Sequence, residues 1–289
     1  IQDVSFNFIS DKNLTLINSI SANYQGILIS NGSISLKRNK QINIEGEFKS
    51  KFNLNEFDIN KLFIKSNIKF LEKNKVNTQG TMIHQFVVKI DENFKLVDYD
   101  YKSSGSISKG QIILNDSFKS SLIKKKIKKL SIQETNLEIN FNKKNNNFLK
   151  VEGLYNLGKL NNKKFKISYN LNKKKPKYLI DIDLAENIFL ELINFKSNHK
   201  NSSNVKIEVG LKKNKIIFDY IKFTEGKNSI FVSNLKLNAK NELESISGID
   251  VLTFNNNQEN NNFEIIFKEK ISIIGKKYDA TYLFKQLTS

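Results

Sequence analysis

Apolar and polar residues alternate along much of this chain, and alternation with a period of two is typical of β-strands that bury one face. The pattern is cleanest in four segments. We expect their apolar positions to lie on one face of a sheet and to line a groove: Leu137, Ile139 and Phe141; Phe165, Ile167 and Tyr169; Val205, Ile207 and Val209; and Phe263, Ile265 and Phe267. A weaker version occurs at Val4, Phe6 and Phe8.

Turn-forming residues separate the alternating segments. We predict turns at Asn31-Gly32, at 225–228 and in the Asn-rich run 255–262, because Asn and Gly tolerate the backbone conformations that tight turns require. Strands that recur about every 8 to 12 residues, without long helical segments between them, favour an antiparallel meander over a parallel α/β sheet. The fold class is therefore all-β, mainly antiparallel.

The end of the chain changes period. From Asp279 onward, Ala280, Leu283, Phe284 and Leu287 have the i, i+3, i+4, i+7 spacing of an amphipathic helix, and Asp279 is placed to cap it. We expect a short helix at about 278–287 whose apolar residues pack on the apolar face of the sheet.

Two other segments leave alternatives open. Residues 186–195 fit either a helical turn or a strand. Residues 124–129 could form a basic amphipathic helix on a membrane surface, but we favour a lysine-rich turn that leads into a strand at 130–132.

The composition limits the kinds of metal site and binding partner that we expect for the chain. The chain has 289 residues, no cysteine, two histidines and a formal net charge of +18. Disulfides and thiolate metal sites are thereby excluded, and two histidines do not make a zinc site. Arg38 is the only arginine among 47 basic residues, whereas phosphate and base recognition favours arginine. The abundance of Lys, Asn, Ile and Phe fits A+T-rich codon usage, so we expect no nucleic-acid partner.

The sequence offers only weak candidates for catalytic or metal-binding residues. The pairs Asp98/Asp100 and Asp181/Asp183 have a spacing that could hold a divalent metal. The same spacing places both carboxylates on one face of a strand, and the polar face of an amphipathic strand explains them more simply. We expect His84 to be a half-exposed strand residue rather than a general base. The sequence therefore predicts no enzyme activity, no catalytic or metal-binding residue and no cofactor.

A large amount of one-sided apolar sheet remains to be explained. Such a sheet packs against a second layer, closes into a barrel, or presents its apolar face to a ligand. The first two outcomes describe a closed core. The third describes a sheet curled into a trough that holds acyl chains.

The final segment resembles a known family. Gly275, Asp279-Ala280, Leu283-Phe284 and Leu287 are similar to the G-x-x-x-D-A-x-x-L-L pattern of the AsmA-like proteins of Gram-negative bacteria, in the branch that carries the DUF3971 region. Three further segments agree in order with that family's L-D-L-T segment, glycine-containing strand pair and G-x-L turn: 182–185, 226–237 and 241–246. The resemblance covers 171–289, whereas residues 1–170 share with the family only short strands separated by turns that contain Gly and Asn. The family's tryptophan and prolines are absent, as in a divergent, A+T-rich member.

This resemblance implies a fold and a function. The fold is an elongated, twisted, mainly antiparallel open sheet, the repeating β-groove. The function is that of a non-enzymatic segment of a periplasm-spanning bridge that conducts phospholipids between the inner and outer membranes. Other parts of the full-length protein anchor such a bridge to the inner membrane. Because the first residue is Ile1 rather than Met, we expect the chain to be a piece of a longer protein.

Two other functions stay open. A β-rich surface or adhesin-like module would have a closed apolar core. A polyanion-binding protein would gather its lysines on one patch and bind with a steep dependence on salt.

Overall fold

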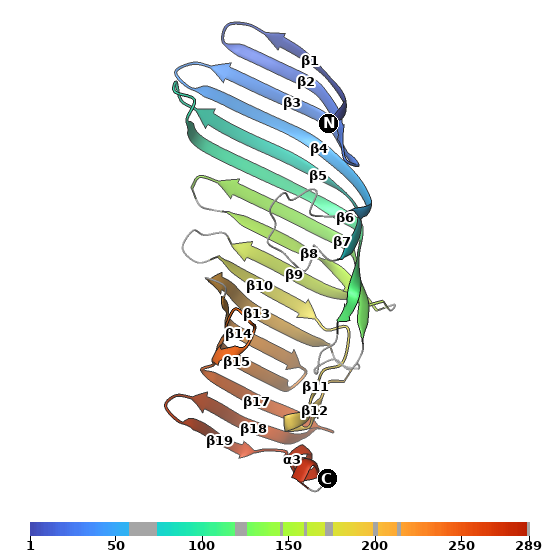
Figure 1. The fold of residues 1–289 in the computed structure, drawn as a ribbon, viewed down its shortest axis with the longest axis vertical. Coiled ribbons are helices and arrows are strands. Elements are labelled where there is room, and N and C mark those ends of the chain that lie inside the picture. Colours follow the sequence, from blue (N-terminus) through green and yellow to red (C-terminus); the bar gives the residue numbers. More distant parts are fainter. Residues whose placement is uncertain are drawn as a thin grey trace. The chain divides into compact units, whose positions relative to one another are not determined.

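The computed structural model describes residues 1–57, 74–118, 126–144, 147–158, 161–170, 176–198, 202–212 and 215–287. Within these ranges the chain is built almost entirely from β-strands, with one short α-helix near the C-terminus (Figure 1). The prediction of an all-β fold with a short terminal helix is confirmed. No helix among the described residues is long and apolar enough to cross a membrane.

The strands follow one another along the chain. The first nine are β1 (Gln2–Ser10), β2 (Leu14–Tyr24), β3 (Ile27–Arg38), β4 (Ile42–Phe57), β5 (Lys75–Ile90), β6 (Leu96–Phe118), β7 (Ile127–Asn142), β8 (Phe148–Asn156) and β9 (Lys163–Asn170). The later ones are β10 (Lys177–Asp183), β11 (Phe189–Leu190), β12 (Phe195–Lys196), β13 (Ser203–Lys212), β14 (Lys215–Glu225), β15 (Asn228–Leu237), β16 (Leu243–Ser245), β17 (Gly248–Asn255), β18 (Gln258–Phe267) and β19 (Ile271–Lys277).

Seventeen strands form an open antiparallel sheet, and β11 and β12 form a separate pair. Neighbours in the sheet are neighbours in sequence: β1 pairs with β2, β2 with β3, β3 with β4, and so on. In the later part β10 pairs with β13, because β11 and β12 leave the sheet. The pairing order is therefore that of the predicted antiparallel meander.

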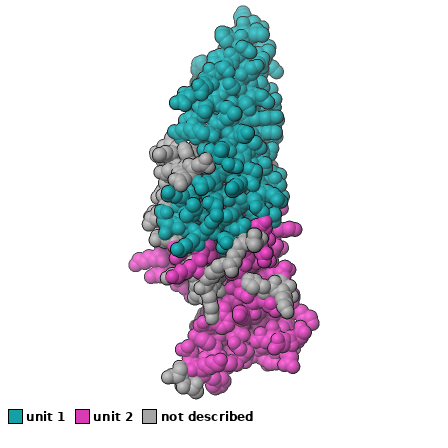
Figure 2. All heavy atoms as spheres, turned by 90° about the vertical axis from the view of Figure 1, so that its right-hand side faces the viewer, with its two compact units in different colours: residues 1–116, 128–159, 168–174 teal, residues 117–127, 160–167, 175–289 magenta. Residues whose placement is uncertain are grey.

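The chain divides into two compact units, coloured separately in Figure 2. Unit 1 comprises 1–116, 128–159 and 168–174, and unit 2 comprises 117–127, 160–167 and 175–289. Each unit is described by itself below.

The predicted turns are confirmed in part. The chain turns at Gly226, between β14 and β15. Asn31-Gly32 is not a turn, because both residues lie inside β3. There Asn31 has a positive φ of 52° at an irregularity in the pairing with β4, so the signal marked a bulge. In the Asn-rich run only 256–257 turn, and Gln258–Asn262 belong to β18.

The terminal helix α3 (Thr281–Leu287) forms as predicted, but its apolar side chains are not buried. Asp279 caps it: its carboxylate accepts the backbone N–H of Thr281 at 3.1 Å and the Thr281 hydroxyl at 2.6 Å. Leu283, Phe284 and Leu287 are 40%, 67% and 82% exposed. The expectation that they pack on the apolar face is wrong, because α3 lies next to the 3₁₀ turn η1 (Glu191–Ile193).

The two ambiguous segments are now assigned where the structure describes them. Residues 186–195 are neither a regular helix nor a long strand, since β11, η1 and the start of β12 follow one another there. Of the lysine-rich segment, 124–125 lie outside the described residues. β7 begins at Ile127, so a strand covers the predicted 130–132.

Candidate apolar ligand-binding face

One face of the sheet in unit 2 is apolar across seven strands. The register places the following residues side by side, one from each strand: Ile180, Ile207, Ile221, Val232, Ile249, Ile265 and Ile273. A second row runs beside it through Ile182, Val205, Phe223, Ile230, Val251 and Phe263. We call the surface formed by these two rows the apolar face of unit 2. Paired residues on antiparallel strands share a face, so the rows follow directly from the alternation in the sequence.

This face is only partly buried. Every residue of the first row from Ile180 to Ile265 is half-buried, and Ile273 is 69% exposed. In the whole described part of the chain ten apolar side chains are buried, and four of them lie on the strands that form this face: Val209, Phe223, Val251 and Phe263. A sandwich core would bury the central rows of both its sheets. The exposure of the first row therefore leaves an apolar surface open to contact.

Residues 184–198, which we call the strap, cover one end of this face. The ring of Phe195 is 1% exposed and packs edge-on against Phe223 with centroids 5.6 Å apart. The strap is held by side chains of later strands, because Asn261 donates its amide to the Ile193 carbonyl at 2.8 Å and Tyr278 donates its hydroxyl to the Leu192 carbonyl at 2.8 Å. The strap therefore covers part of the apolar face, as the terminal helix was expected to do.

A buried polar row lies under the strap, on the same side of the strands as the apolar rows. Glu225, Thr253 and Asn261 are 2%, 0% and 0% exposed. The Glu225 carboxylate accepts the Ser203 hydroxyl and the Asn198 N–H, both at 2.8 Å. Asn261 donates to the Thr253 hydroxyl at 2.8 Å. Buried polar groups need such partners, and here they fasten the strap to the sheet.

Asp279 completes this network. Its backbone N–H donates to the Asn261 side-chain oxygen at 2.8 Å, and its carboxylate accepts the Asn194 amide at 3.0 Å. Burial would raise the pKa of Asp279, but the hydrogen bonds from Thr281, Asn194 and Asn260 outweigh it and lower the pKa to about 2. The aspartate of the terminal motif therefore has a structural role in this chain, as a helix cap and a strap anchor.

Unit 1 carries a row of stacked rings across four strands. Phe48 stacks on His84 with centroids 4.4 Å apart, His84 lies 6.2 Å from Tyr101, and Tyr101 lies 6.4 Å from Phe141. The flanking residues on this side are apolar, among them Ile44, Phe86 and Val88. Unit 1 thus has its own apolar face, which includes the predicted Phe141.

His84 differs from its expectation. It is 9% exposed and hydrogen-bonded, so the prediction of a half-exposed strand residue is wrong. Its Nε2 lies 2.8 Å from the Ser50 hydroxyl, and its Nδ1 lies 2.8 Å from the Tyr101 hydroxyl and 3.0 Å from that of Ser103. Burial lowers the pKa of the imidazole because it disfavours the charged form.

The Ser50–His84 pair does not form a Ser-His-Asp triad in the described structure. Both nitrogens of the imidazole face hydroxyl groups. The aspartate nearest in sequence on the neighbouring strand, Asp100, is paired with Val87, and this pair has the opposite parity to the His84–Ser103 pair, so Asp100 lies on the other face. The arrangement is a polar cluster embedded in an apolar surface.

No family model, curated protein or solved structure matches the chain. The candidate site therefore depends on the geometry of this chain alone.

The opposite face of the sheet in unit 2 carries charged residues, but it is not wholly polar, since the rings of Tyr220 and Phe231 stack there with centroids 6.1 Å apart. Asp181 and Asp183 lie there and share the side-chain amide of Asn204, at 2.7 and 3.0 Å, while Lys206 lies 3.2 Å from Asp181. In unit 1, the Asp98 carboxylate lies 3.9 Å from the Lys89 ammonium, and the Asp100 carboxylate lies 3.4 Å from the Lys102 ammonium. The described residues contain no group of three potential metal ligands.

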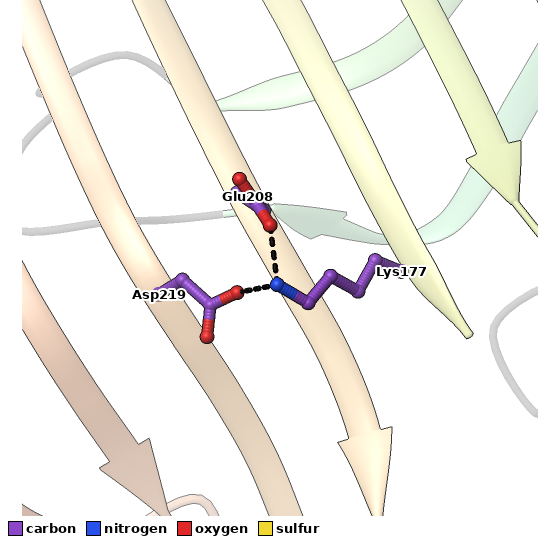
Figure 3. Close-up of polar contacts among 3 residues, drawn as sticks. All are labelled: Lys177, Glu208 and Asp219. Atoms are coloured by element: carbon purple, nitrogen blue, oxygen red, sulfur yellow. Dashed lines mark hydrogen bonds and ion pairs between the residues drawn. The ribbon is translucent and has the colours of Figure 1, made fainter. Parts of the chain in front are cut away.

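Lys177 bridges two carboxylates on the same face. Its ammonium lies between the carboxylates of Glu208, at 2.5 Å, and Asp219 (Figure 3). Asp219 reaches the lysine because the pairing of β13 and β14 is irregular at Glu208 and Val209. Hydrogen bonds to Asp219 and Glu208 raise the pKa of Lys177, so it is charged at every physiological pH.

The predicted groove residues are brought together in part. The register places Val205 and Ile207 on the same face as Phe263 and Ile265, and Val209 and Phe267 continue their strands on that face. Leu137 and Ile139 pair with Val151 and Leu149 in unit 1. Phe165, Ile167 and Tyr169 are half-buried in β9.

The sequence reasoning missed the strap and the polar residues beneath it. A signal was present, because Thr253 and Asn261 occupy positions at which the alternation calls for an apolar residue. A polar residue that takes the place of an apolar one in the alternation, at the end of a strand, indicates that another segment of the chain covers the sheet there.

Proposed function

We propose that this chain is a non-enzymatic lipid-binding protein that holds acyl chains on the apolar face of its sheet. One observation carries the proposal: the row from Ile180 to Ile273 crosses seven strands and stays half-buried or exposed. Burying apolar area contributes about 25 cal/mol per Å², or about 0.8 kcal/mol for each methylene, so a hydrocarbon chain laid on this apolar face gains free energy at every carbon.

The row also supports movement of the ligand. It contains only aliphatic side chains, and the step from one strand to the next is about 4.8 Å. A bound acyl chain meets a similar surface at each step and has no single deep pocket to leave. We therefore propose that lipid moves across the strands, and that the chain is a segment of a bridge of the AsmA-like type that conducts phospholipids between the inner and outer membranes through the periplasm.

The exposure of this row also favours lipid binding over the alternative function, that of a surface or adhesin-like module. That alternative needs a closed core, and its apolar rows would be buried. Half-buried aliphatic rows favour a ligand-binding surface instead.

The experiment measures lipid uptake by the chain from vesicles that contain a fluorescent phospholipid. In the test variant, Ile221→Asn and Ile249→Asn place two amides on the apolar face. In the matched control, Lys222→Asn and Asp250→Asn place the same amides one residue further along each strand, on the opposite face. We expect uptake to fall in the test variant and to be retained in the control. Equal uptake by both variants, with circular dichroism showing intact strands, would overturn the proposal.

A further inference from the structure

The apolar face of unit 2 ends differently at its two rims. At one rim the strap seals the strand ends, as described above. At the other, the described residues 211–212, 215–216, 236–246 and 267–271 leave apolar side chains in solvent: Leu211, Leu243 and Ile271 are 58%, 62% and 67% exposed. We call this second rim the open rim. A ligand that lies along the strands can therefore extend into water at the open rim, whereas the strap covers the other rim.

The open rim is also the basic rim. Its described residues carry six lysines, Lys212, Lys215, Lys236, Lys240, Lys268 and Lys270, and three glutamates, Glu242, Glu244 and Glu269. Lys215 pairs with Glu244 at 2.5 Å, which leaves the open rim with an excess of exposed positive charge. The described residues of the strap rim, with α3 beside it, carry five lysines (Lys196, Lys227, Lys276, Lys277 and Lys285) and five acids (Glu186, Glu191, Glu225, Glu259 and Asp279), so that rim has no positive excess.

The face between the rims has the dimensions of a lipid tail. From Val205 to Leu211, β13 rises about 20 Å, at roughly 3.3 Å per residue. Acyl chains in one leaflet of a bilayer span about 15 Å, half of the roughly 30 Å hydrocarbon core. A tail that starts at the open rim therefore fits between the two rims, and its methyl end lies toward the strap.

We propose that an anionic phospholipid binds unit 2 in one orientation, with its tails along the strands toward the strap and its headgroup among the lysines of the open rim. This inference rests on the proposed function, because it presumes that lipid binds the apolar face. The reverse orientation would place the headgroup phosphate against the buried polar row. There the Glu225 carboxylate is an acceptor, as a phosphate is, and its hydrogen bonds join the sheet to the strap.

The orientation can be tested by fluorescence quenching, because the chain has no tryptophan. Two variants each introduce one: Ile230→Trp near the strap and Leu211→Trp at the open rim. Each is mixed with vesicles of phosphatidylglycerol whose acyl chains carry bromine either near the carbonyl or near the methyl end. Bromine near the methyl end should quench Ile230→Trp more strongly, and bromine near the carbonyl should quench Leu211→Trp more strongly.

The outcomes separate the two proposals. Quenching of both tryptophans without dependence on bromine position, or with the reverse dependence, would overturn the orientation while lipid binding stands. Absence of quenching in both variants would contradict lipid binding itself, and the orientation would fall with it.

The charge of the headgroup is tested separately. Replacing Lys240, Lys268 and Lys270 by Gln should weaken binding of phosphatidylglycerol roughly tenfold at low salt and leave binding of phosphatidylcholine unchanged. The control replaces Lys196, Lys227 and Lys276 by Gln at the strap rim and should leave both lipids unaffected. Equal losses in the two triple variants would show that only the net charge of the chain matters, and would contradict a headgroup site at the open rim.

Discussion

The ring of Phe195 packs edge-on against Phe223 with centroids 5.6 Å apart, although the two residues belong to different sheets. Phe195 comes from the strap, and Phe223 lies on the apolar face beneath it. This contact closes one end of the face, which makes the strap an internal lid rather than a free connection between β10 and β13.

Truncation of Phe195 should release the strap. Phe195→Ala removes a fully buried ring, and such changes cost about 3–5 kcal/mol. Urea unfolding followed by circular dichroism would measure the loss. Leu192→Ala is the control, because Leu192 lies in the same strap but is 65% exposed, and its truncation should change the free energy of unfolding by less than about 0.5 kcal/mol. Similar losses in the two variants would contradict the packing described for Phe195.

Replacement of Asn261 should lower the stability of the chain by more than the size of its side chain suggests. Its side chain donates to the Ile193 carbonyl and the Thr253 hydroxyl and accepts the Asp279 N–H. Asn261→Leu takes this partner from the Ile193 carbonyl and the Asp279 N–H, which costs about 1–3 kcal/mol, while the Thr253 hydroxyl keeps its hydrogen bond to Asn260. Thermal unfolding would measure the loss. Asn262→Leu is the matched control, since its side chain reaches only Glu259, at 3.2 Å. A more stable Asn261→Leu protein would show that the network is not needed to hold the strap.

Gly275 is required by close packing, and this explains its place in the terminal motif. A Cβ at Gly275 would lie 2.4 Å from the Phe263 Cβ and 2.5 Å from the Asn262 carbonyl. Gly275→Ala should therefore destabilise the pairing of β18 with β19, by about 1–3 kcal/mol. At Gly210 the nearest atom to an added Cβ is 3.3 Å away, so Gly210→Ala should cost less. Amide hydrogen exchange in β18 and β19 would report the difference, and unchanged protection in Gly275→Ala would contradict it.

The comparison of sequence and structure shows what periodicity can and cannot predict. The alternation at Val205, Ile207 and Val209 predicted the strand and its apolar side, because side-chain direction in a strand follows from the backbone alone. It could not predict that Phe195, after an irregular segment, covers Phe223, since that contact depends on a path without a period. The helix α3 formed where its spacing predicted it, but spacing does not say which surface a helix meets.

The misjudged residues were polar ones at apolar positions. His84 and Asn261 are in phase with the apolar residues of their strands, and in the structure both are buried and hydrogen-bonded. Their partners, Ser50 and Ile193, are 34 and 68 residues away along the chain. A sequence alone does not reveal such partners, because they become neighbours only once the strands pair.

His84 should make the stability of unit 1 depend on pH. Burial lowers the pKa of its imidazole below 6.5 in the folded chain, so below that pH the unfolded chain binds the proton more readily and stability falls with falling pH. Its contribution is complete above about pH 6.5 and is lost as the pH falls through the folded-state pKa. The groups around the ring are the rings of Phe48 and Tyr101 and the hydroxyls of Ser50, Tyr101 and Ser103, so no carboxylate is there to stabilise the imidazolium.

Denaturation of the parent and of His84→Gln at a series of pH values would measure this dependence. The variant should be less stable at pH 7, because it loses the ring stacking, but its stability should fall less between pH 6.5 and pH 5. His199 is present in both proteins, so its titration cancels in the comparison. Parallel pH profiles for the two proteins would mean that His84 titrates alike in the folded and unfolded chains, against the burial described here.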